Sequence, residues 1–146
     1  KSTNPLKWLF IVKYIGFTFC PDVCPTTLIN MANTLEELKD YKNEITPLFI
    51  SVDPERDNLE ILSEYVSAFH PNIIGLTGSV EDIEKVAADW KVYYKKEANE
   101  DMPDNYTINH LDIIFIANKN NNFVDFVRPN TSYKDIANKL REILRR

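Results

Sequence analysis

The sequence of 146 residues contains only two cysteines, two histidines and two methionines, and it has neither a long apolar run nor a strongly basic segment. Two cysteines are too few for a disulfide-stapled scaffold, and alone they do not identify a redox compartment. The apolar run near the N-terminus, Trp8 to Val12, is far too short to cross a bilayer, and no signal-peptide pattern is visible. We therefore expect either a soluble protein or one whose anchor lies outside this sequence.

The charge balance excludes a class of partner. The formal net charge is −5, and no basic patch is interleaved with aromatic residues, so nucleic acid is not an expected partner. A hydrophobic content of 44% with 27% charged residues is typical of globular proteins. The length suits one domain with its own core, so we expect residues 1–146 to form a single domain.

Hydrophobic patterning predicts alternating strands and helices. The run from Trp8 to Phe17 is almost continuously apolar, as in a central strand that is covered on both faces. Lys13 interrupts this run, which predicts an edge or a bulge there. The charged segment 95–105 predicts an exposed loop. The other predicted elements are helices at 26–41, 59–69, 80–90 and from Ser132 onward, and strands at 47–52, 73–78, 112–117 and 123–127.

This order of elements predicts an α/β sandwich with a central mixed sheet flanked by helices, in which parallel strands come first and an antiparallel pair comes last. It is the element order of a thioredoxin-like domain. Open α/β sheets carry their functional loops at the carboxyl ends of the strands. The acidic turn Asp53–Asp57 is therefore expected near the cysteines, where we favour a structural role in which Asp57 or Asn58 caps the next helix.

Both cysteines lie in the stretch Cys20-Pro21-Asp22-Val23-Cys24-Pro25, between a predicted strand and a predicted helix. A helix N-terminus presents unpaired N–H groups and the positive end of the helix dipole, so we expect the pKa of a thiol there to fall. The spacing lets both sulfurs converge in front of the turn, where they could form a disulfide or chelate a soft metal. Two buried cysteines acting as small hydrophobes would be simpler, but two prolines and an aspartate favour an exposed turn.

His110 is the candidate third donor, because the predicted topology brings the segment before the terminal hairpin beside the cysteine turn. Two thiolates and one imidazole suit Cu(I), and they can hold Cu(II) with an added ligand, whereas structural zinc would require a fourth firm ligand. A hydrolytic Cys–His dyad is also conceivable, although the second cysteine is a liability for a simple nucleophile. Exposure or a local hydrogen bond explains His70, and core packing explains Met31.

Longer motifs resemble the Sco family of copper chaperones, and the resemblance runs from about Trp8 to the C-terminus. It implies a thioredoxin-like fold and copper, Cu(I) or Cu(II), bound by Cys20, Cys24 and His110. No catalytic residue is assigned, although Cys20 and Cys24 are redox candidates. The motifs are Gly16-Phe17-Thr18-Phe19-Cys20-Pro21-Asp22-Val23-Cys24-Pro25, then Pro47-Leu48-Phe49-Ile50-Ser51-Val52-Asp53-Pro54-Glu55-Arg56-Asp57, then Gly75-Leu76-Thr77-Gly78, and a histidine before the hairpin.

The resemblance also implies a function, partners and a place in the cell. A family member delivers copper to the CuA site of cytochrome c oxidase subunit II or, as a thiol–disulfide oxidoreductase, reduces the cysteines of that site. Subunit II and a small copper-donor protein of the intermembrane space are the expected partners. Such proteins face the intermembrane space from a mitochondrial inner-membrane anchor, or face the bacterial periplasm.

The family usually begins with a β-hairpin and a strand before the position of Trp8. We therefore expect this sequence to be a soluble fragment that lacks the first hairpin and the membrane anchor. A thioredoxin-like interaction module with neither metal nor redox chemistry is the remaining alternative.

Overall fold

A computed structural model describes residues 10–18, 23–90, 94–97, 107–110, 113–128 and 130–145; for residues 23, 24, 94–97 and 107–110 the description is limited to the backbone. The strands are β1 (Phe10–Gly16), β2 (Ile45–Ser51), β3 (Ile74–Leu76), β4 (Tyr94–Glu97), β5 (Thr107–His110), β6 (Ile114–Ala117) and β7 (Phe123–Val127). The helices are α1 (Val23–Glu37), α2 (Leu59–Ser67), α3 (Val80–Asp89) and α4 (Tyr133–Leu144), and a short 3₁₀ helix spans Lys39–Tyr41.

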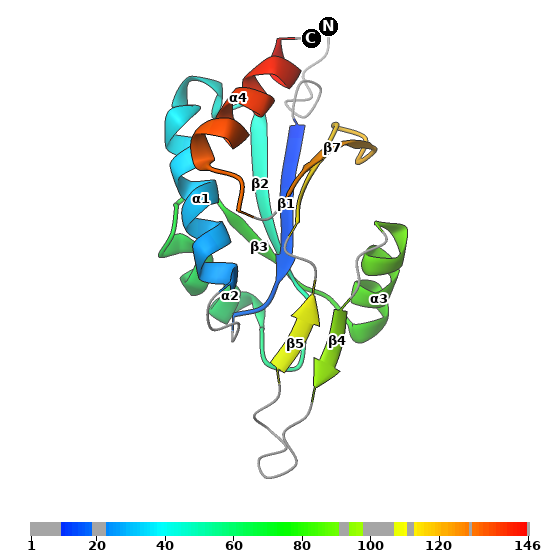
Figure 1. Cartoon of the computed structure of the whole chain (residues 1–146). Helices are drawn as coiled ribbons and strands as arrows, with labels where there is room; N and C mark the ends of the chain where they lie inside the picture. Colours follow the sequence, from blue (N-terminus) through cyan, green and yellow to red (C-terminus); the bar gives the residue numbers. More distant parts are fainter. Residues whose placement is uncertain are drawn as a thin grey trace, which may run out of the picture.

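The central sheet has five strands in the order β3-β2-β1-β6-β7, and β4 pairs with β5 in a separate sheet of two strands. β1 runs parallel to β2, which in turn runs parallel to β3, whereas β6 is antiparallel to β1 and to β7. The three parallel strands therefore end at the same side of the sheet, which we call its carboxyl end. In Figure 1, α1 begins at this end and the β4–β5 pair lies beyond it.

Helices cover both faces of the central sheet. Figure 1 shows α1, α2 and α4 on one side and α3 on the other. On the first side, the ring of Phe49 in β2 lies between those of Tyr14 in β1 and Tyr65 in α2, with centroid distances of 6.0 and 5.8 Å. On the second side, the ring of Trp90, directly after α3, lies 5.5 Å from that of Phe115 in β6. The predicted mixed sheet flanked by helices is confirmed.

Side-chain caps fix where three of the helices begin. The side chain of Asn58 accepts a hydrogen bond from a backbone N–H in the first turn of α2, so Asn58 and not Asp57 is the cap of this helix. Ser79 and Asp82 form a reciprocal capping box at the start of α3. Ser132, where the last helix was predicted to start, is the cap of α4.

Several details differ from the sequence-based predictions. Lys13 lies inside the central strand, where it pairs with Leu48 on one side and Phe115 on the other, so the predicted edge or bulge is wrong. Helix α1 begins at Val23, three residues earlier than predicted. The predicted exposed loop starts inside β4, because backbone pairing with β5 forms a strand from a segment that has no apolar alternation.

Candidate metal and thiol site

The structure places the backbone of two of the three predicted donors. Cys24 is the second residue of α1, so it belongs to the first turn of a 15-residue helix, where backbone N–H groups lack intrahelical partners. His110 is the last residue of β5 and pairs with Tyr94 of β4. Cys20, and the side chains of Cys24 and His110, lie outside the described residues. That the three side chains form one site remains a prediction.

The backbones of Cys24 and His110 lie at the same end of the sheet. Tyr14, near the end of β1, pairs with Ile114, the first residue of β6. The chain that leads onward to Cys20 and the chain that arrives from His110 therefore meet neighbouring strands at the carboxyl end. His110 precedes Ile114 by four residues, which span at most about 14 Å. The described topology is thus compatible with the predicted cluster.

A buried carboxylate holds the chain that leads from β1 to Cys20. Asp57 is fully buried, and its Oδ2 accepts hydrogen bonds from the backbone N of Thr18 at 3.0 Å and from the Oγ of Ser51 at 2.6 Å. Its Oδ1 accepts from the Oγ1 of Thr18 at 2.5 Å. Burial of a carboxylate is costly unless several donors compensate it, and three donors do so here. The carboxylate thereby joins the ends of β1 and β2.

The rest of the acidic turn supports this arrangement. The backbone N of Val52 donates to the carbonyl of Gly16 at 2.8 Å, which continues the pairing of β2 with β1 past the strand ends. Arg56 forms an ion pair with buried Asp53, with Nε 2.5 Å from Oδ2. The guanidinium carbon of Arg56 lies 5.9 Å from the centre of the Phe17 ring. The turn therefore contacts the last residues before the cysteine stretch at several points.

Sequence reasoning missed the contact between Asp57 and Thr18. It assigned the acidic turn mainly to helix capping, and the cap proved to be the neighbouring Asn58. One usable signal was present, since Thr18 lies two residues before Cys20 and Asp57 follows the next parallel strand. Neighbouring parallel strands end together, so a donor and an acceptor at these places are brought close.

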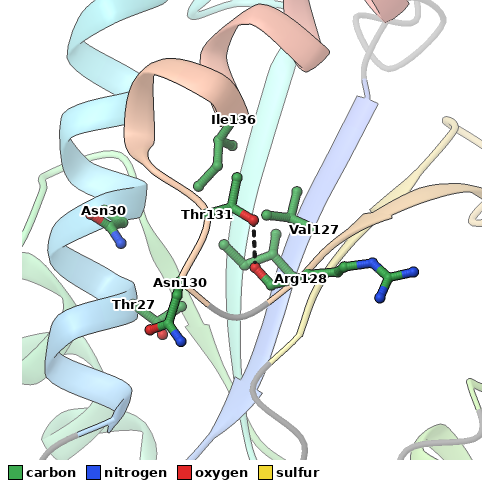
Figure 2. A pocket seen from close by; sticks show the side chains of 8 residues that line it. Thr27, Asn30, Val127, Arg128, Asn130, Thr131 and Ile136 are labelled. Atoms are coloured by element: carbon green, nitrogen blue, oxygen red, sulfur yellow. Dashed lines mark hydrogen bonds between the residues drawn. The ribbon is translucent and has the colours of Figure 1, made fainter.

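A small cavity lies beside the first half of α1, between this helix and the segment that joins β7 to α4 (Figure 2). Its volume is about 20 Å³, which is room for about one water molecule. Thr131 donates its hydroxyl hydrogen to the carbonyl of Arg128 at 2.7 Å and so shapes the wall formed by this segment. The cavity is too small for an organic substrate. Its lining residues are Thr27, Asn30, Ile114, Val127, Arg128, Asn130, Thr131 and Ile136.

Two residues weighed as alternative ligands have structural roles. The Nε2 of His70 lies 2.8 Å from the Oε2 of Glu36, and its Nδ1 accepts from the backbone N of Asn72, so a local hydrogen bond explains this histidine as predicted. Met31 is buried in the core. Within the described ranges, no group of three or more His, Cys, Asp or Glu side chains could hold a metal ion. No helix in this part of the chain has both the length and the apolarity to cross a membrane.

Comparison with known proteins identifies the family. The SCO1/SenC family profile matches residues 7–145. The chain belongs to the SCO1/SenC family. Protein SCO1 homolog 1, mitochondrial, of Arabidopsis thaliana is 43% identical over 125 residues, which are 85% of this chain and 36% of that protein. This chain therefore spans little more than a third of that Sco relative.

Solved Sco structures share the fold. The crystal structure of Arabidopsis thaliana ScoI with copper bound has a TM-score of 0.86 and 38% identity, over 96% of this chain and 86% of that chain. BsSco is described as a member of the Sco family of cytochrome c oxidase assembly proteins. At a TM-score of 0.71 and 22% identity, over 95% of this chain and 82% of that chain, it shows the fold alone. The expected thioredoxin-like fold is confirmed.

Proposed function

We propose that this chain is a copper-binding metallochaperone for assembly of the CuA site of cytochrome c oxidase subunit II. Copper is its cargo, carried as Cu(I) or Cu(II) by the thiolates of Cys20 and Cys24 and the imidazole of His110. The observation that carries the proposal is the backbone of Cys24 and His110 at one end of the sheet in a Sco-family chain whose copper-bound Arabidopsis relative has the same fold.

The chemistry of the donor set supports copper over other metals. Thiolates are soft ligands that favour Cu(I), and three donors suit its trigonal coordination. The N–H groups and dipole at the start of α1 favour the thiolate form of Cys24. Transfer then requires that ligands of the target replace the two thiolates and the imidazole of the carrier one after another, with no change in the oxidation state of the metal.

We propose that subunit II receives the copper and that a small copper-donor protein of the intermembrane space supplies it. The proposed location is the intermembrane-space side of the mitochondrial inner membrane, or the periplasm in a bacterium. The mitochondrial Sco relative of Arabidopsis supports the mitochondrion, and a Sco-family lipoprotein of Bacillus anthracis supports attachment to a membrane in bacteria.

Anaerobic titration of the reduced protein with Cu(I), against a competing chelator, tests the metal site. We expect the wild type to bind one copper, and His110→Ala to bind it more weakly by about tenfold or more, since one of three donors is lost. His70→Ala is the matched control, because this second histidine is held by Glu36 and should leave affinity unchanged. Full copper binding by Cys20→Ser, Cys24→Ser or His110→Ala would contradict the proposal.

The second candidate function is a thiol–disulfide oxidoreductase that reduces the CuA cysteines. It is favoured by the position of Cys24 in the first turn of α1, where a thiolate attacks a disulfide readily and the second cysteine resolves the mixed disulfide. In this case His110→Ala should reduce a disulfide-bonded CuA-loop peptide as fast as the wild type does. Either cysteine variant should be inactive in the same assay.

A further inference from the structure

We propose that Asp57 is the positioning residue of the cysteine stretch: it fixes the residue two places before Cys20 and so determines where the Cys20 thiolate can meet its copper. The inference rests on the proposed copper site. It concerns a residue that is not one of the three proposed ligands.

The contacts of Thr18 show how tightly the chain is held at this point. Asp57 accepts both the backbone N–H of Thr18 and its hydroxyl, so the carboxylate fixes the main chain and the side chain of the same residue. Thr18 lies outside both neighbouring elements, because β1 ends at Gly16 and α1 begins at Val23. These two hydrogen bonds therefore set the direction in which the chain leaves the sheet toward Cys20.

The acceptor itself is rigid. The backbone N of Asp57 donates to the carbonyl of Asp53 at 2.9 Å, and the backbone N of Asp53 donates to the Oγ of Ser51 at 3.0 Å. Ser51 in turn donates to Asp57, which closes a ring of hydrogen bonds at the end of β2. The next residue, Asn58, caps α2. Because the Asp57 carboxylate is held in place, its hydrogen bonds also hold Thr18 in place. A mobile carboxylate would let Thr18 move with it.

The far side of the cysteine stretch is also fixed. Leu28 and Met31 of α1 are buried in the core, with exposed fractions of 0% and 2%, so the helix that carries Cys24 is held by packing. The relative position of the two thiolates then depends mainly on the chain between Thr18 and Val23. Ligands of a metal are held in place by surrounding hydrogen bonds, whose loss typically lowers metal affinity by about 10- to 100-fold.

Two substitutions separate position from charge. Asp57→Ala removes all three acceptor contacts. Asp57→Asn removes the charge but can keep the geometry, because the amide oxygen can accept from the N–H of Thr18 and the hydroxyl of Ser51, while the amide NH₂ can donate to the Oγ1 of Thr18. If Asp57 acts by position, Asp57→Asn should have the Cu(I) affinity of the wild type. If it acts by its charge, Asp57→Asn should have the lower Cu(I) affinity of Asp57→Ala.

The experiment compares these variants with Asn58→Ala, which removes the cap of α2 one residue away and lowers stability without touching Thr18. Two quantities are measured: the affinity of the reduced protein for Cu(I), and the pH profile of alkylation of the two thiols in the metal-free protein. Thr18→Val is added because it removes only the hydroxyl bond, and it therefore tests the same contact if Asp57→Ala does not fold.

We expect Asp57→Ala to bind Cu(I) about tenfold or more weakly and to shift the alkylation profile. The Cu(I) affinity and the alkylation profile of Thr18→Val should lie between those of Asp57→Ala and the wild type. Both quantities should be close to the wild-type values in Asp57→Asn and in Asn58→Ala. Wild-type affinity in Asp57→Ala and Thr18→Val would overturn the inference, as would equal losses in Asp57→Ala and Asn58→Ala, or in Asp57→Ala and Asp57→Asn. If the wild type itself bound no copper, the proposed function would fail, while the alkylation profiles would still decide the role of Asp57.

Discussion

Lys13 is a charged side chain in the middle of the central strand, with only 3% of its surface exposed. Its Nζ donates to the Oδ1 of Asn121 at 2.7 Å and lies 3.5 Å from the centre of the Trp90 ring. These contacts replace part of the lost hydration, since an aromatic face attracts a cation. They do not replace all of it: burial lowers the pKa of Lys13 from 10.5 to about 8.

This pKa predicts a specific dependence of stability on pH. Between pH 8 and 10.5 the unfolded chain holds the proton of Lys13 and the folded chain has lost it, so the free energy of unfolding rises with pH in this window. The gain over the whole window is about 3 kcal/mol, from about 1.4 kcal/mol for each unit of pKa.

Urea unfolding of the wild type and of Lys13→Met at pH 7, 9 and 10.5 measures this effect. The difference in the free energy of unfolding, wild type minus variant, should increase with pH, because all other titrating groups are shared and cancel. A difference that stays constant or falls over this range would show that folding does not lower the pKa of Lys13.

The burial of Lys13 could not be read from the local sequence. Its two partners follow it by 77 and 108 residues, and a lysine within an apolar run is ordinarily a sign of an exposed strand edge. The contact between Thr18 and Asp57 spans 39 residues and was missed for the same reason. Patterns with short periods predict elements well, but they do not identify which polar groups meet across the sheet.

Strand β3 and helix α2 pack closely because Gly75 has no side chain. A Cβ at this position would lie 2.9 Å from the Cβ of Leu62 and 3.4 Å from its backbone, and the backbone of a packed helix does not move aside easily. We expect Gly75→Ala to lower the free energy of unfolding by about 1–3 kcal/mol, the usual cost of overpacking.

Chemical denaturation of Gly75→Ala tests this contact, and Ile74→Ala in the same strand is the control. Ile74 is 48% exposed, so its truncation removes less buried surface and should cost less. If Gly75→Ala proved as stable as the wild type, α2 would have room to shift away from β3.

Among the elements, those with a strong hydrophobic period were predicted best. The strands of the central sheet and all four helices were found, with errors of a few residues at the ends; the start of α1, for example, lies at Val23 and not at residue 26. The β4–β5 pair was missed, because Lys95, Lys96 and Glu97 carry no strand signal and their pairing with β5 depends on the backbone. The three ligands of the candidate site stay a prediction, and the contact of Asp57 with Thr18 was not predicted from the sequence.

At the scale of the whole molecule, we expect the β4–β5 pair to be the least stable part of the described structure. It has only two strands and four residue pairs, and a pair of this kind is marginally stable by itself. The central sheet, in contrast, is covered by helices on both sides. Local opening should therefore be frequent in β4 and β5 and rare in β1 and β2.

Hydrogen exchange with and without Cu(I) can test both this difference and the proposed site. We expect the amides of β5 to exchange much faster than those of β1 in the metal-free protein. Copper should slow exchange in β5, because a ligand that binds only the closed form stabilises it and His110 ends this strand. In His110→Ala, copper should no longer slow exchange in β5, whereas exchange without copper should match that of the wild type. Slowing by copper that persisted in this variant would contradict the assignment of His110 as a ligand.

The contact between Lys13 and Trp90 also has an optical consequence. Indole emission depends on the electric field across the ring, and the ammonium group lies 3.5 Å from the ring centre. The chain has two tryptophans, Trp8 and Trp90, so replacing Trp8 by Phe leaves one indole, which lies beside the amine of Lys13. The emission wavelength and intensity of Trp90 then report, in solution and without any label, whether the buried amine of Lys13 carries its proton.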